Sequence, residues 1–241
     1  MNLAKIRREL APTGSLRVAI NLANTLLVSG RSQSGVPEGL APDLGAQIAA
    51  RLGVPVELVP FEAPSAIAES ADRGLWDVAL IAAEPARAKR IFFTRAYSEI
   101  QASYLVRSEL PFQQVSDVDQ PATRIAAYRG SAYDLWLSRN IQFAEIVRAD
   151  SLEASVRVFV EDGLEALAGL RASLTSQVTA IPGARLLPGC FSRVQQSVGT
   201  SRANEEGALF LEVFVNEAIM SGSISRLIKQ HGVAGLDVAS R

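Results

Sequence analysis

The sequence predicts an α/β fold built on a parallel sheet, and three observations carry this prediction. The run Val78–Ala83 is apolar without alternation, which is typical of a strand covered on both faces. Segments with strand and helix periodicity alternate ahead of it, in the order strand, helix, strand, helix, strand, which implies right-handed parallel crossovers. At 241 residues, 48% of them apolar, the chain can form a substantial core in one large or two small domains.

The N-terminal part of the chain supplies the elements that lead to this run. Leu3, Ile6, Arg7 and Leu10 fit a short amphipathic helix. Pro42 opens a later helix that Gly53 ends. We expect strands at 15–20, 54–58 and 78–83, helices at 42–53 and 65–73 with Ser65 as the cap of the second, and a loop over 21–38.

A second α/β run follows a strand at 102–106. The proline and glutamine residues of segment 109–121 predict a crossing segment instead of a helix. Ser131 with Asp134 three residues later is typical of a helix start. The expected elements are strands at 124–128, 145–148, 165–170 and 194–200, and helices at 131–139, from Ser151, at 204–220 and at 223–230. Two such runs with a crossing between them predict two lobes.

Composition excludes several classes of function. The net charge of −1 and the absence of a basic cluster argue against nucleic-acid or membrane surfaces, and no run reaches the ~18 apolar residues of a membrane span. Cys190 is the only cysteine, so neither an intrachain disulfide nor a cysteine metal site is expected. His231 is the only histidine, and it is interpreted as a cation at a helix end. We expect neither cofactor nor metal.

The N-terminal segment MNLAKIRRELAPTG is charged and has no apolar core of a signal peptide. The sequence as it stands therefore predicts a cytoplasmic protein. The alternative is a periplasmic protein from which a leader has been removed.

Polar residues follow the buried run at the carboxyl end of the predicted sheet, where open α/β sheets bind their ligands. They are Glu84 and Arg87, and Pro85 between them is placed in the first turn of a short helix. The guanidinium of Arg87 is a planar fork of donors suited to a carboxylate or a phosphate. The other interpretation is a surface arginine on a basic helix with Lys89 and Arg90.

In their order and their residues, the motifs of this sequence resemble those of the type II periplasmic solute-binding proteins of the amino-acid-binding type, extracellular solute-binding protein family 3. The closing segment MSGSISRLIKQHG is also similar to the end of that family, so the resemblance covers nearly the whole chain. The stretches that carry it are GSLRVAI (14–20), EGLAPDLGAQIAARLG (38–53), RGLWDVALIAAEPARAKRIFFTRAY (73–97), RIAAYRGSAYDLW (124–136) and VEDGLEALAGL (160–170).

The resemblance implies two mixed, mostly parallel sheets with flanking helices, joined by a two-strand hinge. Lobe 1 then comprises about 1–105 and 197–241, and lobe 2 comprises 106–196, with crossings near 104–108 and 196–200. It implies a small ligand in the cleft between the lobes, a monomer, and service to an ABC permease. Such lobes close over the ligand like a hinged clamp.

The resemblance also implies site residues. Arg87 falls on the arginine that clamps the ligand's carboxylate, at the end of the strand that includes Ala82. Gly130 and Ser131 fall on the turn that binds the same carboxylate at a helix N-terminus. For Ser131 a pure helix cap is the alternative role, and the two roles are compatible.

Other positions depart from the family. Pro85 and Glu84 stand where a threonine is usual, and Leu170, followed by Arg171, stands where an acid pairs the ligand's ammonium group. The aromatic residue that stacks on the ligand in the family is also missing. We therefore hypothesise a ligand with more negative charge or less ammonium character than a common amino acid, clamped by Arg87 and Arg171. The alternative keeps an amino acid, with Glu84 as its ammonium partner, and the simplest role for Glu84 is an ion pair with Arg87.

The leading functional hypothesis is a binding protein for an amino acid or related carboxylate in an ABC-type transport system. A cytoplasmic ligand-sensing module on the same fold is an alternative. An enzyme similar to cyclohexadienyl dehydratase is another, with Glu84 as its candidate general acid.

Overall fold

A computed structural model describes residues 2–240 of the chain, which divide into two compact units. Unit 1 comprises the chain up to Glu99 and again from Gln195, and unit 2 comprises Ile100–Val194. The sequence analysis placed these borders at 105/106 and 196/197. Two strands, β6 (Ile91–Arg107) and β11 (Ser192–Ser201), continue across the borders.

The main strands of unit 1 follow the order β4-β1-β5-β11-β6, and the short strand β12 also pairs with β6. The strands β4, β1 and β5 are parallel, as the sequence predicted, and β11 runs antiparallel to β5. Every residue of β5 is buried, which confirms the interpretation of the apolar run. The elements are α1 (Leu3–Leu10), β1 (Leu16–Asn21), β2 (Gly30–Arg31), β3 (Pro37–Glu38), α2 (Leu40–Leu52), β4 (Val56–Phe61), α3 (Pro64–Glu69), β5 (Val78–Ala82), η1 (Arg87–Lys89), α7 (Glu205–Met220), α8 (Ser223–Gln230) and β12 (Leu236–Val238).

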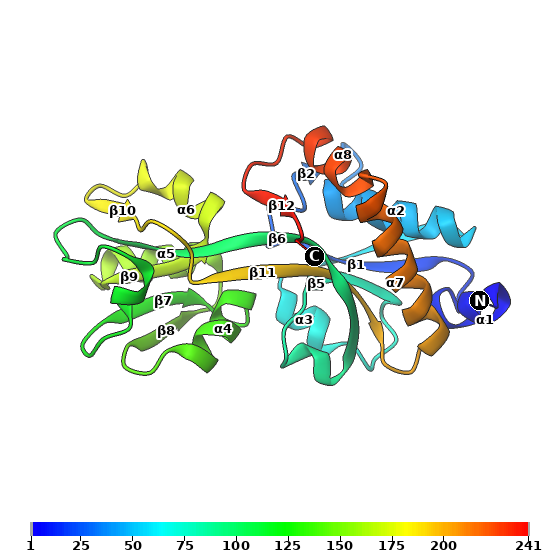
Figure 1. The fold of residues 1–241 in the computed structure, drawn as a ribbon, viewed down its shortest axis with the longest axis horizontal. Helices are drawn as coiled ribbons and strands as arrows, with labels where there is room; N and C mark the ends of the chain where they lie inside the picture. The colour runs from blue at the N-terminus through cyan, green and yellow to red at the C-terminus, as the bar shows by residue number, and fades with distance from the viewer. Residues whose placement is uncertain (1, 241) are drawn as a thin grey trace. The chain divides into compact units, whose positions relative to one another are not determined.

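Helices cover both faces of this sheet. The helices α2, α7 and α8 lie on one side and α3 on the other (Figure 1). Alternating residues of the strands serve the two faces: Val18 contacts α2 near Gly45, whereas Ala19 belongs to a cluster with Ile67 of α3 and Trp76. Alternation of side chains along a strand makes this two-sided burial possible.

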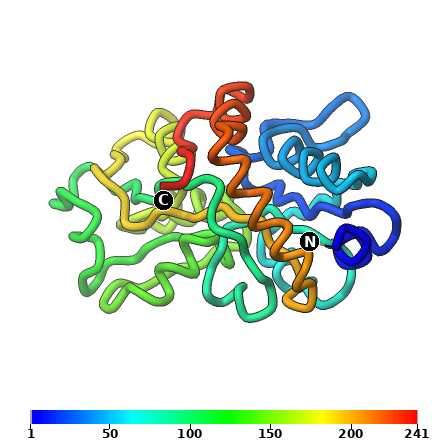
Figure 2. The backbone as a smooth tube through the Cα atoms, turned by 45° about the vertical axis from the view of Figure 1, so that its right-hand side comes forward, coloured from blue at the N-terminus to red at the C-terminus, as the bar shows by residue number. Residues whose placement is uncertain are grey.

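The last long helix returns to the start of the chain. Helices α1 and α7 lie side by side although almost the whole sequence separates them (Figure 2). The backbone N–H of Gly207 donates to Glu9 at 2.7 Å, and Leu10 packs where a side chain at Gly207 would stand. This docking places the C-terminal helices in unit 1, as the family resemblance implied.

Unit 2 repeats the α/β plan on a smaller scale. Its strands follow the order β6-β9-β7-β8, with β8, β7 and β9 parallel and β9 antiparallel to β6. Helices α5 and α6 cover one face and α4 the other (Figure 1). The elements are η2 (Val115–Val118), β7 (Arg124–Tyr128), α4 (Ala132–Asn140), β8 (Glu145–Ala149), α5 (Leu152–Glu161), β9 (Ala166–Leu170), α6 (Arg171–Val178) and β10 (Ala184–Leu186).

Several local predictions need correction. Ser65 is not the cap of α3, because the helix begins at Pro64 and Ala63 takes the extended conformation ahead of it. Segment 109–121 is not a crossing between lobes, since it lies within unit 2 and contains η2. The prediction missed α6, which has no side-chain cap and few apolar residues, and it missed the short strands β2, β3, β10 and β12.

In each unit, an arginine on the first parallel strand contacts the residues just before the third strand. In unit 1, the Nε of Arg17 donates to Asp77 at 3.0 Å, and its NH1 donates to the carbonyl of Gly74. In unit 2, the Nε of Arg124 donates to Glu165 at 3.0 Å, and its NH2 donates to the carbonyl of Gly163. In both units the acid directly precedes the third strand of the run, and its carboxylate also accepts the backbone N–H of the arginine.

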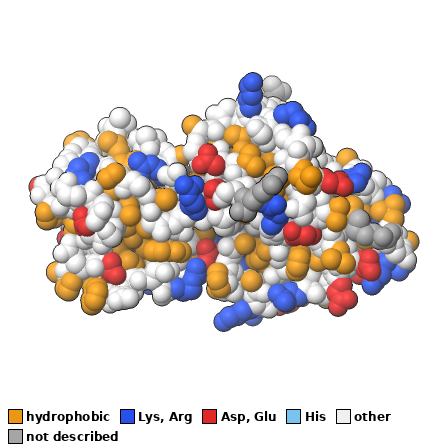
Figure 3. Space-filling model, viewed as in Figure 1, with side chains coloured by type: hydrophobic (Ala, Val, Ile, Leu, Met, Phe, Trp, Pro, Cys, Tyr) orange, Lys and Arg blue, Asp and Glu red, His pale blue; other side chains and the backbone are white. Residues whose placement is uncertain are grey.

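Charges are interspersed on the surface. On the face drawn in Figure 3, Lys and Arg side chains alternate with Asp and Glu. Among residues 2–240, no single helix is long and apolar enough to cross a membrane. Helices α7 and α8 pass that test only as a pair, which is bent by 69°, and six residues of α7 are buried in unit 1.

We predict that Asp77→Ala lowers the free energy of unfolding by about 2–4 kcal/mol, because it leaves the guanidinium of Arg17 without its carboxylate. Urea unfolding measures this loss. The control is Asp72→Ala, which removes an exposed partner of Arg90 at 3.7 Å in the same unit. A change of less than about 0.5 kcal/mol is expected for the control. Equal effects of the two substitutions would contradict the prediction.

The Arg124–Glu165 pair predicts a dependence of stability on pH. The hydrogen bond from Arg124 lowers the pKa of Glu165 below its usual range. A lowered pKa in the folded state stabilises the protein above the unfolded pKa of about 4.3, and this stabilisation is lost as the pH falls through the folded pKa. Glu165→Gln is therefore expected to flatten the decline of the unfolding free energy between about pH 5 and pH 3. Parallel curves for the two proteins would refute this.

Candidate functional site

The first candidate site lies where β5 ends in unit 1. The chain leaves the strand at Ala82 and turns at Glu84, whose carbonyl accepts the backbone N–H groups of Arg87 and Ala88 at 2.9 Å each. Pro85 lies in this turn and not in the first turn of a helix as predicted, because the helix that follows is the single 3₁₀ turn η1 (Arg87–Lys89) with Ala86 as its N-cap. The turn folds Arg87 back toward the strand end.

The side chain of Arg87 is buried, with 5% of the residue exposed. Its NH1 donates to the carbonyl of Ala82 at 2.8 Å. Burial lowers the pKa of Arg87 to about 10, whereas the charge of Glu84 raises it, so the guanidinium is protonated at neutral pH. Glu84 is itself only 8% exposed. The structure thus brings three predicted residues together around one buried cation.

Two residues that sequence analysis missed stand beside this strand end. The backbone N–H of Ala83 donates to the carbonyl of Gln195 at 2.9 Å, and the side chain of Gln195 donates to Glu99 at 3.0 Å. Glu99 is 6% exposed. Only the strand order β5-β11-β6 brings these residues near Arg87, and no local pattern in the sequence encodes that order.

The second candidate site is the start of α4 in unit 2. Gly130 has a φ of 72°, a conformation that favours glycine, and its N–H donates to the carboxylate of Asp134 at 2.8 Å. Ser131 is the N-cap, and its hydroxyl accepts the backbone N–H of Asp134 at 3.1 Å. The cap role of Ser131 is therefore confirmed, and its ligand role stays a prediction.

The end of β9 holds the remaining predicted residue of unit 2. Leu170 precedes α6, and Arg171 is the first residue of that helix. The NH1 of Arg171 donates to the carbonyls of Leu187 and Gly189 at 2.9 and 2.6 Å. Arg171 thus holds the segment that leads into β11, while its role toward an anion stays a prediction. Strands β7 and β9 are parallel neighbours, so Ser131 and Arg171 follow strand ends at one edge of the sheet.

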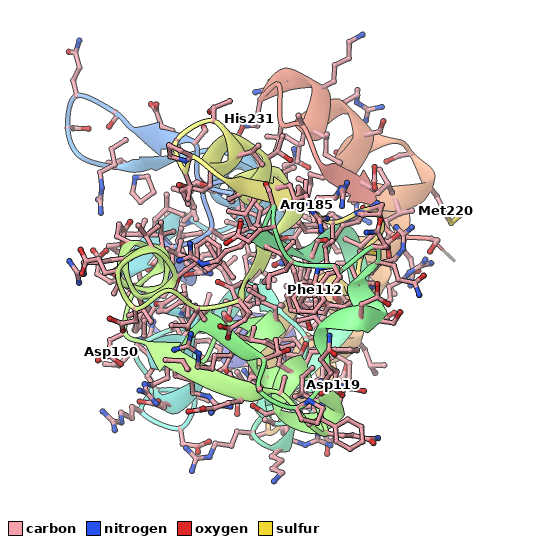
Figure 4. All side chains as sticks on the ribbon, turned by 90° about the vertical axis from the view of Figure 1, so that its left-hand side faces the viewer. Phe112, Asp119, Asp150, Arg185, Met220 and His231 are labelled. Carbon is pink, nitrogen blue, oxygen red and sulfur yellow. The ribbon has the colours of Figure 1, made fainter. Side chains whose placement is uncertain are left out.

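A surface hollow of about 400 Å³ in unit 2 is a different kind of feature. Its acids are engaged by backbone amides: Asp117 accepts from Gln113 and Gln114, and Asp119 accepts from residues 142–144. These bonds lower the pKa of both carboxyls, against the opposing effect of burial. Phe112 and Arg185, labelled in Figure 4, join at this end of the unit, where Arg185 donates to the carbonyl of Phe112. The acids of the hollow therefore stabilise the local backbone of unit 2, and we do not count the hollow as a candidate binding site.

Two α/β units joined by two continuous strands define a periplasmic-binding-protein-like fold, and comparison with known families agrees. The chain belongs to the bacterial extracellular solute-binding proteins, family 3, whose model matches residues 16–234. The predicted α/β class and the family resemblance are confirmed. No curated protein sequence matches the chain.

Solved structures share this fold at low sequence identity. The substrate-binding protein AbpA of an amino-acid ABC transporter from Streptococcus pneumoniae, solved with L-arginine, is 19% identical over 92% of this chain and 96% of its own, with a TM-score of 0.74. A binding component of an ABC transporter from Wolinella succinogenes, solved with lysine, is 17% identical over 92% and 97%, with a TM-score of 0.76. An ancestral amino-acid-binding protein, described as a precursor of cyclohexadienyl dehydratase, is 17% identical over 92% and 97%, with a TM-score of 0.74.

The capping geometry gives a matched pair of variants. Ser151 caps α5 as Ser131 caps α4, with its hydroxyl accepting the N–H of Ala154 at 3.0 Å. We expect Ser131→Ala and Ser151→Ala each to lower the free energy of unfolding by about 1 kcal/mol, because each leaves one helix N–H without its acceptor. Only Ser131→Ala is expected to weaken ligand binding, which calorimetric titration measures. Equal affinity in the two variants would remove Ser131 from the binding residues.

Proposed function

We propose that this protein binds a small carboxylate, either an amino acid or a related acid, as the solute-binding component of an ABC-type transport system. The guanidinium of Arg87 carries the proposal. It is a buried, protonated fork of donors at the carboxyl end of a central strand, which is where open α/β sheets bind ligands. Membership of a solute-binding family supports the same role.

The position of Arg87 suits a carboxylate better than a solvent-exposed arginine would. One nitrogen is fixed by the carbonyl of Ala82, so the side chain loses little further freedom when it binds. Burial reduces screening by water and strengthens its attraction to an anion. The neighbouring carboxylate of Glu84 balances the cation in the absence of ligand, and a ligand's carboxylate must compete with it. A ligand that also carries an ammonium group can engage Glu84 at the same time.

We propose further that the protein acts as a monomer and delivers its ligand to a permease. The amino-acid ligands named for two structural neighbours support amino acids as the first compounds to test. A thermal-shift screen with amino acids, keto acids, dicarboxylates and small phosphorylated compounds identifies ligands, because a compound that binds only the folded state raises its midpoint.

We predict that Arg87→Ala lowers the affinity for the best compound of that screen by about 100-fold, as expected for loss of one partner of a buried charge pair. Arg87→Lys keeps the charge but loses the planar fork, so an intermediate loss is expected. Calorimetric titration gives both values. The control is Arg90→Ala, since Arg90 is an exposed cation three residues away. An unchanged affinity in Arg87→Ala refutes the proposed site.

A dehydratase is the second candidate function, because the fold is shared with an ancestral precursor of cyclohexadienyl dehydratase. Glu84 is the candidate proton donor for that reaction. The charge of Glu84 interacts with that of Arg87, which gives Glu84 the role of a counter-ion. Loss of prephenate during incubation with the protein would support the enzyme, and we expect no conversion.

A further inference from the structure

Two buried polar side chains lie on one face of β11 in unit 1. In the register between β11 and β5, Thr200 pairs with Val78 and Gln196 pairs with Ala82. Residues four apart along a strand share a face of the sheet, so both side chains belong to the same face. Thr200 is 0% exposed and Gln196 is 3% exposed. Both polar groups are therefore removed from water and need hydrogen-bond partners within the protein or from a bound molecule.

The two side chains differ in whether the chain supplies such partners. The hydroxyl of Thr200 donates to the carbonyl of Asp77 at 2.8 Å and accepts from Nδ2 of Asn204 at 3.0 Å. For the side-chain amide of Gln196, residues 2–240 provide no hydrogen-bond partner. A primary amide has two donors and an acceptor, and leaving them unpaired in a buried place costs free energy. The partner of Gln196 is therefore sought outside the chain.

Gln196 lies at the strand end that also holds Arg87. Its partner Ala82 is the last residue of β5, and the carbonyl of Ala82 accepts NH1 of Arg87 at 2.8 Å. One step further, the backbone N–H of Ala83 donates to the carbonyl of Gln195 at 2.9 Å. Bonded and non-bonded pairs alternate in an antiparallel ladder, so Ala82 and Gln196 form a non-bonded pair, the kind in which side chains are closest. Gln196 and Arg87 thus flank the same residue.

We propose that Gln196 is a further ligand-binding and specificity-determining residue, whose Nε2 donates to an oxygen of the carboxylate ligand bound by Arg87. This inference rests on the proposed function and deepens it, because it adds an uncharged donor to the charged one. A carboxylate suits this pair of donors, since its two oxygens together accept several hydrogen bonds. A compound without an acceptor at this place leaves the amide unpaired and binds more weakly.

The first test separates a binding role from a structural one. Gln196→Met keeps the size of the side chain and removes its hydrogen-bonding groups. Without ligand, this variant is expected to raise the midpoint of thermal unfolding by about 2–4 °C, because an apolar group replaces an unpaired buried amide. Calorimetric titration uses L-arginine, L-lysine, L-glutamate and succinate as probes. The variant is expected to bind the probe that the wild-type protein prefers about 5- to 10-fold more weakly, the effect of one hydrogen bond.

A second variant and a matched control sharpen the test. Gln196→Glu keeps the shape and replaces the donor by a negative charge, so it is expected to bind the same probe more weakly than Gln196→Met does. The control is Ser197→Ala. Ser197 is the next residue of β11, is 1% exposed, and also has a hydroxyl without a partner in the described chain. It pairs with Ile81, which belongs to the cluster on the α3 side of the sheet. The affinity of Ser197→Ala is expected to equal that of the wild-type protein.

The outcomes separate this inference from the function on which it rests. Probe binding that depends on Arg87 and is unchanged in both Gln196 variants overturns only the role of Gln196. A ligand-free Gln196→Met protein that is less stable than the wild type also overturns it, because the amide then has a partner before any ligand binds. Equal losses of affinity in Gln196→Met and Ser197→Ala assign the effect to the strand and overturn it as well. Binding of no probe by the wild-type protein overturns both the inference and the proposed function.

Discussion

Burial of the guanidinium of Arg87 is the main physical constraint at the end of β5 in unit 1. Removing a cation from water costs several kcal/mol unless nearby groups compensate it. The compensation here includes the carbonyl of Ala82 and the charge of Glu84. Both groups lie at or just after the end of β5, an inner strand of the sheet whose residues are all buried. The apolar strand and the proline turn therefore together position the groups that compensate the buried charge.

The two units share one stabilising arrangement, in which an arginine contacts an acid and a glycine carbonyl. Each has parallel strands whose first member carries an arginine, and each arginine reaches an acid and a glycine carbonyl just before the third strand. These contacts join the entry of one strand to the entry of another and leave the opposite edge of the sheet open. The opposite edge is where β5 ends beside Arg87 and where β7 ends beside Ser131. Stabilising contacts thus lie at one edge of each sheet, and the buried charge of Arg87 and the cap at Ser131 lie at the other.

Features encoded within a few residues could be predicted from the sequence, whereas features that depend on strand order could not. The caps at Ser131 and Ser151, the end of α2 at Gly53 and the buried strand β5 each follow from local chemistry. Ser65 was a wrong prediction because Pro64, one residue earlier, fixes the helix start more strongly. The contact of Gln195 with Glu99 joins residues almost 100 positions apart, and the contact of Arg148 with Asp134 needs the register of β8. Family resemblance located Arg87 and Ser131, but it gave neither of these partners.

The positive groups of each unit carry an internal carboxylate, and this pairing bears on the kind of ligand that fits. In unit 1 the cation is Arg87 and the acid is Glu84; in unit 2 the donors belong to the start of α4 and the acid is Asp134. A bare anion that approaches either group is attracted by the donor and repelled by its acid, so the net electrostatic gain is small. A zwitterion places its own positive charge near one of the acids, and both ends of the ligand then gain. The net charge around each of these donor groups is therefore smaller than the donors alone would give.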